Sequence, residues 1–244
     1  MLPAWIALQF LSSLPVRLPG MPTPAQMGRS VLWYPAVGLL FGLLLWGASA
    51  LLQGVMPALQ AALLLTLWVG LSGALHLDGL ADSADAWLGG FGDRERTLEI
   101  MKDPRSGPIA VVALMLVLLL KFCALWALIE QGAGAWLVLA PVVGRMALLG
   151  LLRDTPYVRK GGLGAALAEH LPRDQARWIM LGCTALAVLL GGWTALWVLL
   201  LALGTYCLLR RAMCRRLGGT TGDTAGALLE LLELVVLLSL ALLH

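Results

Sequence analysis

Seven long apolar stretches constrain this sequence more than any other feature. A helix needs roughly 20 apolar residues to cross the hydrocarbon core of a bilayer, and the stretches that qualify lie at 31–52, 58–77, 107–130, 134–152, 175–191, 193–209 and 224–243. Sixty per cent of the chain is hydrophobic and only 13% is charged, whereas an ordinary soluble domain is about half apolar and roughly a quarter charged. The sequence therefore predicts an all-α, polytopic transmembrane helical bundle of about seven spans, in which the two short stretches around Gly191 and Gly192 could form one broken hairpin.

The basic residues are distributed unevenly between the loops. All of the 17 Lys and Arg except Lys121 and Arg145 lie in or beside the N-terminal segment and the second, fourth and sixth loops that these spans define. Cytoplasmic loops of membrane proteins carry an excess of Lys and Arg. We therefore expect a multi-pass protein of the cytoplasmic (inner) membrane with its N-terminus in the cytoplasm, its C-terminus outside, and its active site on the cytoplasmic side. The net charge of +3 is too small to indicate a nucleic-acid partner.

Two acidic ladders occupy the loop 76–107. The first is formed by Asp78, Asp82 and Asp85, and the second by Glu95, Glu99 and Asp103. Because a helix turns by about 100° per residue, each ladder lies along one helical face. Carboxylates without His or Cys partners suit Mg²⁺ or Mn²⁺, so the sequence favours a divalent metal site here. A solvated acidic face, paired with nearby basic residues, is the alternative.

A glycine-rich and acidic motif occupies residues 218–233 near the C-terminus. It contains Asp223, and it continues into the last apolar stretch with Glu230 and Glu233. Acids within a membrane span are costly and mark functional sites by default. The cations Lys121 and Arg145 also fall within spans, where they could either pair with these two glutamates or hold a phosphate. The basic, glycine-rich loop 157–164 is suited to phosphate oxygens, with a lipid headgroup contact as the equal alternative.

Metal-binding carboxylates that face basic loops at a membrane surface indicate phosphoryl-type transfer, in which metal ions neutralise a pyrophosphate. The layout resembles that of the CDP-alcohol phosphotransferases. The spacing differs, however, because Ala86 follows Asp85 where that family has a glycine, and the Ala-Arg pair and second Asp pair of that family are not found in register.

A closer resemblance is carried by four motifs in order: 76–85 (HLDGLADSAD), 99–107 (EIMKDPRSG), Gly144–Arg145, and 218–227 (GGTTGDTAGA) with Glu230. Segments 9–16 (QFLSSLPV) and 34–38 (YPAVG) add to them. Together they resemble the cobalamin synthase family (adenosylcobinamide-GDP ribazoletransferase) over the whole chain. The chain departs from the family pattern at Ala86, Pro104 and Pro108, which affects local turns and removes no carboxylate.

The resemblance implies an activity. The family joins adenosylcobinamide-GDP to α-ribazole, or to α-ribazole 5′-phosphate, in an Mg²⁺-dependent transfer that releases GMP, the late nucleotide-loop assembly step of cobalamin biosynthesis. It implies a single integral membrane catalytic domain over residues 1–244, with the lipid bilayer and the two small-molecule substrates as partners. A homo-oligomer remains open.

The resemblance also implies roles for individual residues. The metal ligands would be Asp78, Asp82 and Asp85. The catalytic carboxylates would be Asp82, together with Asp85 or Asp103 as the base. The substrate-binding residues would be Lys102, Arg105, Arg145, Asp223 and Glu230. The rival interpretations are a CDP-alcohol phosphotransferase of phospholipid synthesis and a membrane transporter; a transporter built from repeats should show two matching halves, and the Asp ladder has no counterpart after residue 140.

Overall fold

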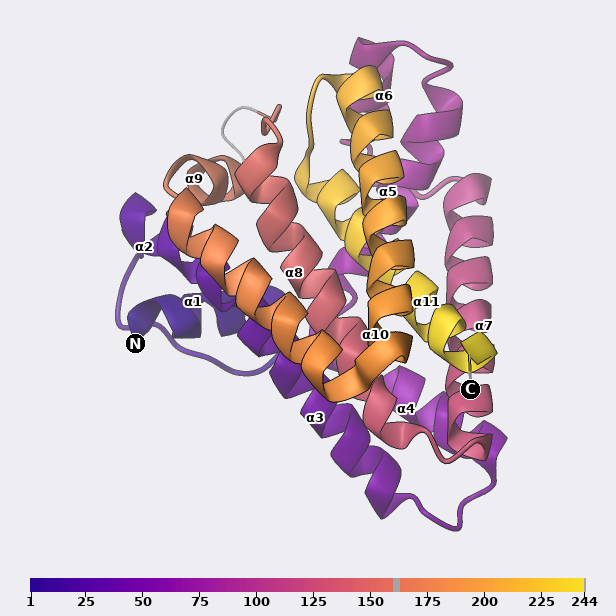
Figure 1. The fold of residues 1–244 in the computed structure, drawn as a ribbon. Helices are drawn as coiled ribbons and strands as arrows, with labels where there is room; N and C mark the ends of the chain where they lie inside the picture. The colour runs from indigo at the N-terminus through magenta and orange to yellow at the C-terminus, as the bar shows by residue number, and fades with distance from the viewer. Residues whose placement is uncertain (160–162, 244) are drawn as a thin grey trace.

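A computed structural model describes residues 1–159 and 163–243, and every regular element within these ranges is helical (Figure 1). The predicted all-α class is therefore confirmed. In chain order the elements are α1 (Leu2–Leu11), α2 (Pro24–Ser30), η1 (Val31–Trp33), α3 (Tyr34–Leu51), α4 (Pro57–Ser72), α5 (Leu75–Gly89), α6 (Arg94–Ile100), α7 (Pro108–Glu130), η2 (Gly134–Val138), α8 (Leu139–Asp154), α9 (Leu163–Glu169), α10 (Arg173–Leu217) and α11 (Gly222–Leu243).

Several of these helices are long and apolar enough to cross a membrane. Five qualify in the described part of the chain, and the bent pair α4–α5 makes a sixth if it counts as one span. The length criterion counts α10 once, although Gly192 interrupts it with φ 57° and ψ −142°. Figure 1 shows the two arms of α10 running in opposite directions, which is the broken hairpin expected around this residue. The chain is thus a multi-pass membrane protein, while seven spans stay a prediction.

The break between α4 and α5 differs from the sequence-based expectation of one span over 58–77. Gly73 and Ala74 both have positive φ, at 60° and 57°, and the N–H of Ala74 donates to the carbonyl of Val69. This left-handed pair ends α4 and turns α5 by 88° from its direction; glycine commonly provides such an ending. The apolar periodicity continues across the break, so hydropathy alone does not detect it. The bend carries the acidic α5 away from the line of the apolar α4.

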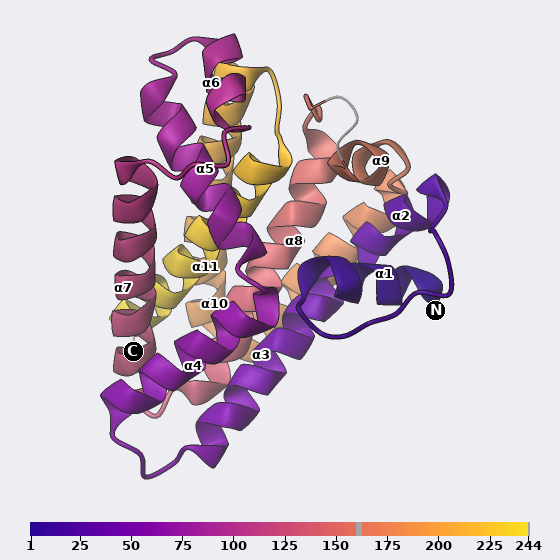
Figure 2. The same ribbon diagram turned by 180° about the vertical axis from the view of Figure 1, so that it is seen from behind.

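Helix α11 lies at the centre of the bundle. It packs against α5, α7, α8 and α10, and the two opposite views of Figures 1 and 2 show it enclosed by these elements. Most of its side chains are buried. The position of α11 is therefore fixed from several sides, including that of Asp223 in its first turn.

A buried charge network joins α7, α8 and α11. Lys121 donates to Glu230 at 2.6 Å and to Glu233 at 2.7 Å, and Arg145 pairs with Glu233. These side chains are at most 5% exposed. Two cations and two carboxylates balance formally, so the structure shows the pairing alternative for Lys121 and Arg145. An aromatic ring also covers each cation. The Lys121 nitrogen lies 4.8 Å from the centroid of the Trp68 ring, and the Arg145 guanidinium carbon lies 4.7 Å from the centroid of the Phe41 ring.

Helices α5 and α11 cross at very short range because two glycines face the crossing. A Cβ atom added to Gly79 would lie only 2.7 Å from the carbonyl oxygen of Asp223, and one added to Gly226 would lie 3.2 Å from the backbone of His76. Both glycines have φ values that any residue can adopt. Their role is therefore to allow close contact between the helix that carries Asp82 and the helix that carries Asp223.

The substitution Gly79→Ala should push α5 and α11 apart. We expect the free energy of unfolding to fall by about 1–3 kcal/mol, which is typical of overpacking. Activity should also fall, because Asp82 and Asp223 move apart. Thermal denaturation followed by tryptophan fluorescence measures the first effect. The matched control is Gly182→Ala in α10, where a Cβ has no atom within 4 Å; a Gly79→Ala protein as stable as this control would contradict the close crossing.

The substitution Lys121→Met should destabilise the fold strongly. It leaves Glu230 and Glu233 without their shared cation, and breaking a buried ion pair from one side costs about 3–5 kcal/mol, or roughly 10 °C in melting temperature for a chain of this size. The control is Lys102→Met, which removes an exposed lysine and should change stability by no more than about 0.5 kcal/mol. Equal melting temperatures for the two variants would show that the network does not hold the bundle.

Candidate active site

Three carboxylates from two distant segments meet where α5 and α11 cross. Asp78 and Asp82 are four residues apart on α5 and therefore share one face. Asp223 lies in the first turn of α11. Asp82 is close enough to Asp78 and Asp223 to be affected by the charge of both, and Asp223 is affected by that of Asp78. The predicted convergence of the first ladder with the C-terminal motif is therefore present for these three residues.

The positive member of the cluster is Arg159. Its Nη1 lies 3.3 Å from Oδ2 of Asp223, and its charge also acts on Asp82. The arginine side chain is 30% exposed, so a ligand can reach it. The cluster thus combines oxygen donors for a cation with a guanidinium that can bind a phosphate.

A short backbone pairing between residues 156–158 and Thr220 positions Arg159 beside the carboxylates. Val158 donates to the carbonyl of Thr220 at 2.9 Å, and Thr220 donates to the carbonyl of Pro156 at 2.8 Å. The loop that follows α8 is thereby tied to the glycine-rich turn before α11. Sequence reasoning identified loop 157–164 as suited to phosphate but did not single out Arg159, because its partner lies 64 positions further on. Residues 160–162 of that loop lie outside the described residues.

The start of α11 is held by reciprocal hydroxyl contacts. Thr221 N–H donates to Oγ1 of Thr224 at 2.9 Å, and Thr224 N–H donates to Oγ1 of Thr221 at 3.2 Å. This is the N-terminal capping arrangement that satisfies otherwise free amides. Asp223 sits between the two threonines, where the helix dipole also favours negative charge.

Asp85 of α5 lies beside the start of α7 and contacts its backbone. Its carboxylate accepts hydrogen bonds from the backbone N–H groups of Gly107 and Ala110, the latter at 2.9 Å. These amides belong to the start of α7, so Asp85 caps that helix. Backbone donors engage both oxygens of Asp85, and this stabilises α7; its assignment as a metal ligand or base stays a prediction.

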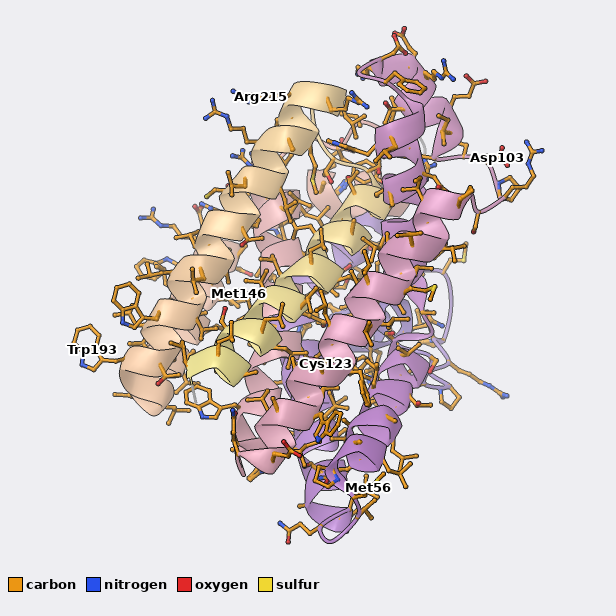
Figure 3. All side chains as sticks on the ribbon, turned by 90° about the vertical axis from the view of Figure 1, so that its right-hand side faces the viewer. Met56, Asp103, Cys123, Met146, Trp193 and Arg215 are labelled. Carbon is orange, nitrogen blue, oxygen red and sulfur yellow. The ribbon has the colours of Figure 1, made fainter. Side chains whose placement is uncertain are left out.

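The second stretch of predicted site residues, 102–105, lies on an exposed connection between α6 and α7. Asp103 accepts hydrogen bonds from Arg105 at 2.8 and 2.9 Å, and these hydrogen bonds lower the pKa of Asp103 to about 2. Figure 3 shows Asp103 projecting from the edge of the bundle. A carboxylate of such low pKa is a weak proton acceptor. Lys102 is exposed, and the carbonyl of its neighbour Met101 accepts a hydrogen bond from Arg159 at 3.4 Å.

Arg145 and Glu230 lie in the buried charge network and away from solvent. The structure shows each of them paired with opposite charges, as burial in an apolar bundle requires; their contact with substrate stays a prediction. Sequence reasoning had this pairing as its alternative.

The donor chemistry of the cluster suits a hard cation, because Asp78, Asp82 and Asp223 offer only oxygen. Within the described ranges no three His, Cys, Asp or Glu side chains come together tightly enough to enclose a metal ion. The carboxylates therefore form an open, negatively charged face and not a closed cage.

Comparisons with known proteins agree with one another. A model of the cobalamin-5-phosphate synthase family matches residues 3–241. Proteins named adenosylcobinamide-GDP ribazoletransferase are 77% identical in Pseudomonas entomophila (strain L48) and in Pseudomonas putida (strain W619), over 242 residues that cover 99% of each chain. The Pseudomonas fluorescens (strain Pf-5) protein of that name is 71% identical over 243 residues, 99% of this chain and 100% of its own. No solved structure matches the chain. Because the family model and these relatives both cover almost all of the sequence, the chain belongs to the cobalamin-5-phosphate synthase family.

Proposed function

We propose that this chain is a transferase that joins adenosylcobinamide-GDP to α-ribazole, or to α-ribazole 5′-phosphate, with release of GMP and with Mg²⁺ as cofactor. The observation that carries the proposal is the 77% identity, over 99% of the chain, to a relative that bears the name adenosylcobinamide-GDP ribazoletransferase. The carboxylate and guanidinium cluster supplies a place for the chemistry. The whole chain then acts as one integral membrane catalytic domain.

The proposed topology has the N-terminus in the cytoplasm of an inner membrane and the C-terminus outside, with seven spans if both arms of α10 cross. It is supported by the distribution of basic residues and by the arrangement of the bundle. Figure 3 shows Arg215 and Asp103 toward one end of the molecule and Met56 at the opposite end. The carboxylate cluster would then face the cytoplasm.

The reaction needs one bond made and one broken. A ribose hydroxyl of the acceptor attacks the phosphorus on the cobinamide side of the pyrophosphate, the new P–O bond forms, and the bond to the GMP oxygen breaks. Asp82 is the carboxylate best placed to take the hydroxyl proton, because it is half-buried at the centre of the cluster. Arg159 is placed to bind phosphate oxygens and stabilise the negative charge that develops on them.

Asp78, Asp82 and Asp223, whose carboxylates otherwise repel one another, would offer oxygen ligands to magnesium on the open face of the cluster, since magnesium in such sites is usually bound by one or two carboxylates. When bound, it would neutralise pyrophosphate charge. The protein contributes the orientation of these groups: the α5–α11 crossing sets the distance between the acids, and the Val158–Thr220 pairing sets the position of the arginine.

The decisive assay incubates purified protein in lipid nanodiscs with adenosylcobinamide-GDP, α-ribazole and Mg²⁺, and measures GMP and the completed corrinoid. The Asp82→Asn protein should lose activity by about 100-fold or more, as expected when a general base is removed, while its melting temperature stays close to that of the wild type. Asp174→Asn, an exposed acid of α10, is the control. Full activity of Asp82→Asn, or release of a nucleotide other than GMP by the wild type, would reject the proposal.

Asp85 and Asp78 should respond differently to amide substitution. Asp85→Asn weakens the cap of α7 and should cost about 0.5–2 kcal/mol of stability, with no change in the Mg²⁺ concentration that gives half-maximal activity. Asp78→Asn should raise that concentration roughly tenfold or more with little change in stability. Titration of activity with Mg²⁺ and thermal melts on both proteins measure these effects; the reverse pattern would make Asp85, and not Asp78, the metal ligand.

A further inference from the structure

An apolar groove of about 270 Å³ lies between α5, α11 and the second arm of α10, which is the part at 193–217 that follows the break. Figure 3 views this side of the bundle, with α11 running between that arm and α7 and with Arg215 near the end of the arm. The α5 residues of the groove lie on the helix face opposite Asp78 and Asp82; they are Leu80, Ser83, Ala84 and Trp87. The groove is therefore separate from the carboxylate cluster and belongs to a different ligand.

The walls of the groove are almost entirely apolar. Leucines such as Leu80, Leu209 and Leu231 line it along its length, and Leu208 beside it is 71% exposed, as expected of a side chain that faces lipid in a membrane protein. The groove is smaller than a typical pocket for a drug-sized ligand, and a helix with its side chains is about 10–12 Å wide. It thus accommodates one hydrocarbon chain of the surrounding bilayer and not a helix of another protein.

One polar atom in the groove lacks a partner. Ser83 is 8% exposed, and its hydroxyl makes no hydrogen bond within the described ranges. The hydroxyl of Thr224, by contrast, is engaged by Thr220 and Thr221. A buried hydroxyl left unpaired costs free energy, so the occupant should offer an acceptor at the level of Ser83. A plain hydrocarbon offers none, whereas a glycerophospholipid offers the carbonyl oxygens of its esters.

An arginine stands at one end of the groove. Arg216 lies one turn beyond Ala212 on the same face of α10, and Ala212 lines the groove. The Nη2 of Arg216 donates to the carbonyl of Trp87 at 2.7 Å, and its Nε donates to Oγ1 of Thr97 at 3.1 Å. These neutral partners leave the charge of the guanidinium without a carboxylate in the described part of the chain. Such a guanidinium can bind a phosphate.

The end of α10 that carries this arginine is strongly basic. Its last eight residues include Arg210, Arg211, Arg215 and Arg216, and the whole second arm contains no acid. None of these four arginines forms an ion pair with a carboxylate among the residues that the structure describes. Arginines near a membrane surface attract anionic lipids. The charge of this arm therefore favours an anionic lipid over a zwitterionic one.

The spacing of the two polar groups along the groove matches a phospholipid. Trp87, whose carbonyl binds Arg216, and Ser83 are four residues apart on α5, which is about 6 Å along the helix axis. The headgroup region of a bilayer has a similar thickness, about 5–7.5 Å in each leaflet. A phosphate at Arg216 thus places the glycerol esters near Ser83 and an acyl chain beyond them, between Leu80 and Leu209.

We propose that this groove binds one anionic glycerophospholipid of the bilayer. Its phosphate lies on Arg216, an ester carbonyl accepts the hydrogen bond of the Ser83 hydroxyl, and one acyl chain follows the groove. The lipid fills the space between α5 and α10 and supports α5 on the side away from the carboxylates. The inference goes beyond the proposed function and does not depend on it, because a lipid bound here takes no part in the transfer.

The first test removes the two partners of the Ser83 hydrogen bond separately. Native mass spectrometry of the delipidated protein in detergent measures binding of dioleoylphosphatidylglycerol and of its diether analogue, which lacks both ester carbonyls. The wild type should bind the ester lipid about fivefold more tightly, and Ser83→Ala should bind both alike, since a neutral hydrogen bond contributes such a factor. Ser239→Ala, which truncates another serine of 8% exposure, should keep the preference. Equal affinities in the wild type, or a preference that survives in Ser83→Ala, would overturn the assignment.

The second test concerns the charge of the headgroup. The wild type should bind dioleoylphosphatidylglycerol more tightly than dioleoylphosphatidylcholine, and Arg216→Gln should reduce the ratio of the two affinities about fivefold. The matched control is Arg211→Gln, which removes an exposed arginine of the same arm on a different face of the helix. Equal binding of the two lipids by the wild type, or equal ratios in the two variants, would remove the phosphate from Arg216.

A third variant tests the space itself. Ala212→Phe fills the groove and should weaken binding of the ester lipid by at least about tenfold. It should also abolish the rise in melting temperature that a bound lipid gives the wild type. Leu208→Phe, on the exposed face of the same arm, is the control. Normal lipid binding by Ala212→Phe would overturn the proposal, as would loss of an oligomer with the lipid retained, which would make the groove a contact between copies of the chain. If Ala212→Phe does not fold, the comparison of ester and ether lipids on the wild type and Ser83→Ala decides.

Discussion

The close crossing of α5 and α11 is the contact on which the candidate site depends. Gly79 and Gly226 remove side chains from the crossing, so the backbone of one helix approaches that of the other. Asp82 and Asp223 are 141 positions apart in sequence and become neighbours only through this approach. The backbone pairing of Val158 with Thr220 then adds Arg159 to the same place. Main-chain contacts thus bring the elements of the site together.

The buried charge network holds α11 further along its length, where Lys121 and Arg145 pair with Glu230 and Glu233. An acid at the bilayer centre costs roughly 2.5–3.5 kcal/mol on insertion scales, and α11 carries two of them. Lys121 and Arg145 offset that cost because they come from two different helices and meet Glu233 together. The network therefore fixes the rotation of α11, which determines where Asp223 points.

Much of the architecture could be predicted from the sequence, since it follows from hydropathy and helical spacing. The apolar stretches, the break at Gly192 and the shared face of Asp78 and Asp82 follow from local patterns, whereas the place of Asp223 in the site was implied by the family resemblance. The bend at Gly73 and Ala74 could not be predicted, because the apolar pattern runs across it. The partners of Asp85 and Arg159 depend on tertiary contacts, with backbone amides in one case and with a carboxylate in the other. Such contacts leave no periodic signal in the sequence. Asp78, Asp82 and Asp85 therefore appear equivalent in the sequence, although only Asp85 caps the start of α7.

The order of the charges along the chain has a consequence for how the protein enters its membrane. Helices α7 and α8 leave the ribosome before α11, so Lys121 and Arg145 are synthesised well ahead of the glutamates that neutralise them. Until the last 20 or so residues emerge, the nascent protein holds two uncompensated cations in apolar segments. The C-terminal helix in turn is stable in lipid only if Lys121 and Arg145 are already in place to pair with its two glutamates. Assembly of the bundle therefore depends on insertion of its final helix. A chain truncated before this helix would leave Lys121 and Arg145 unpaired within the membrane, which is energetically unfavourable.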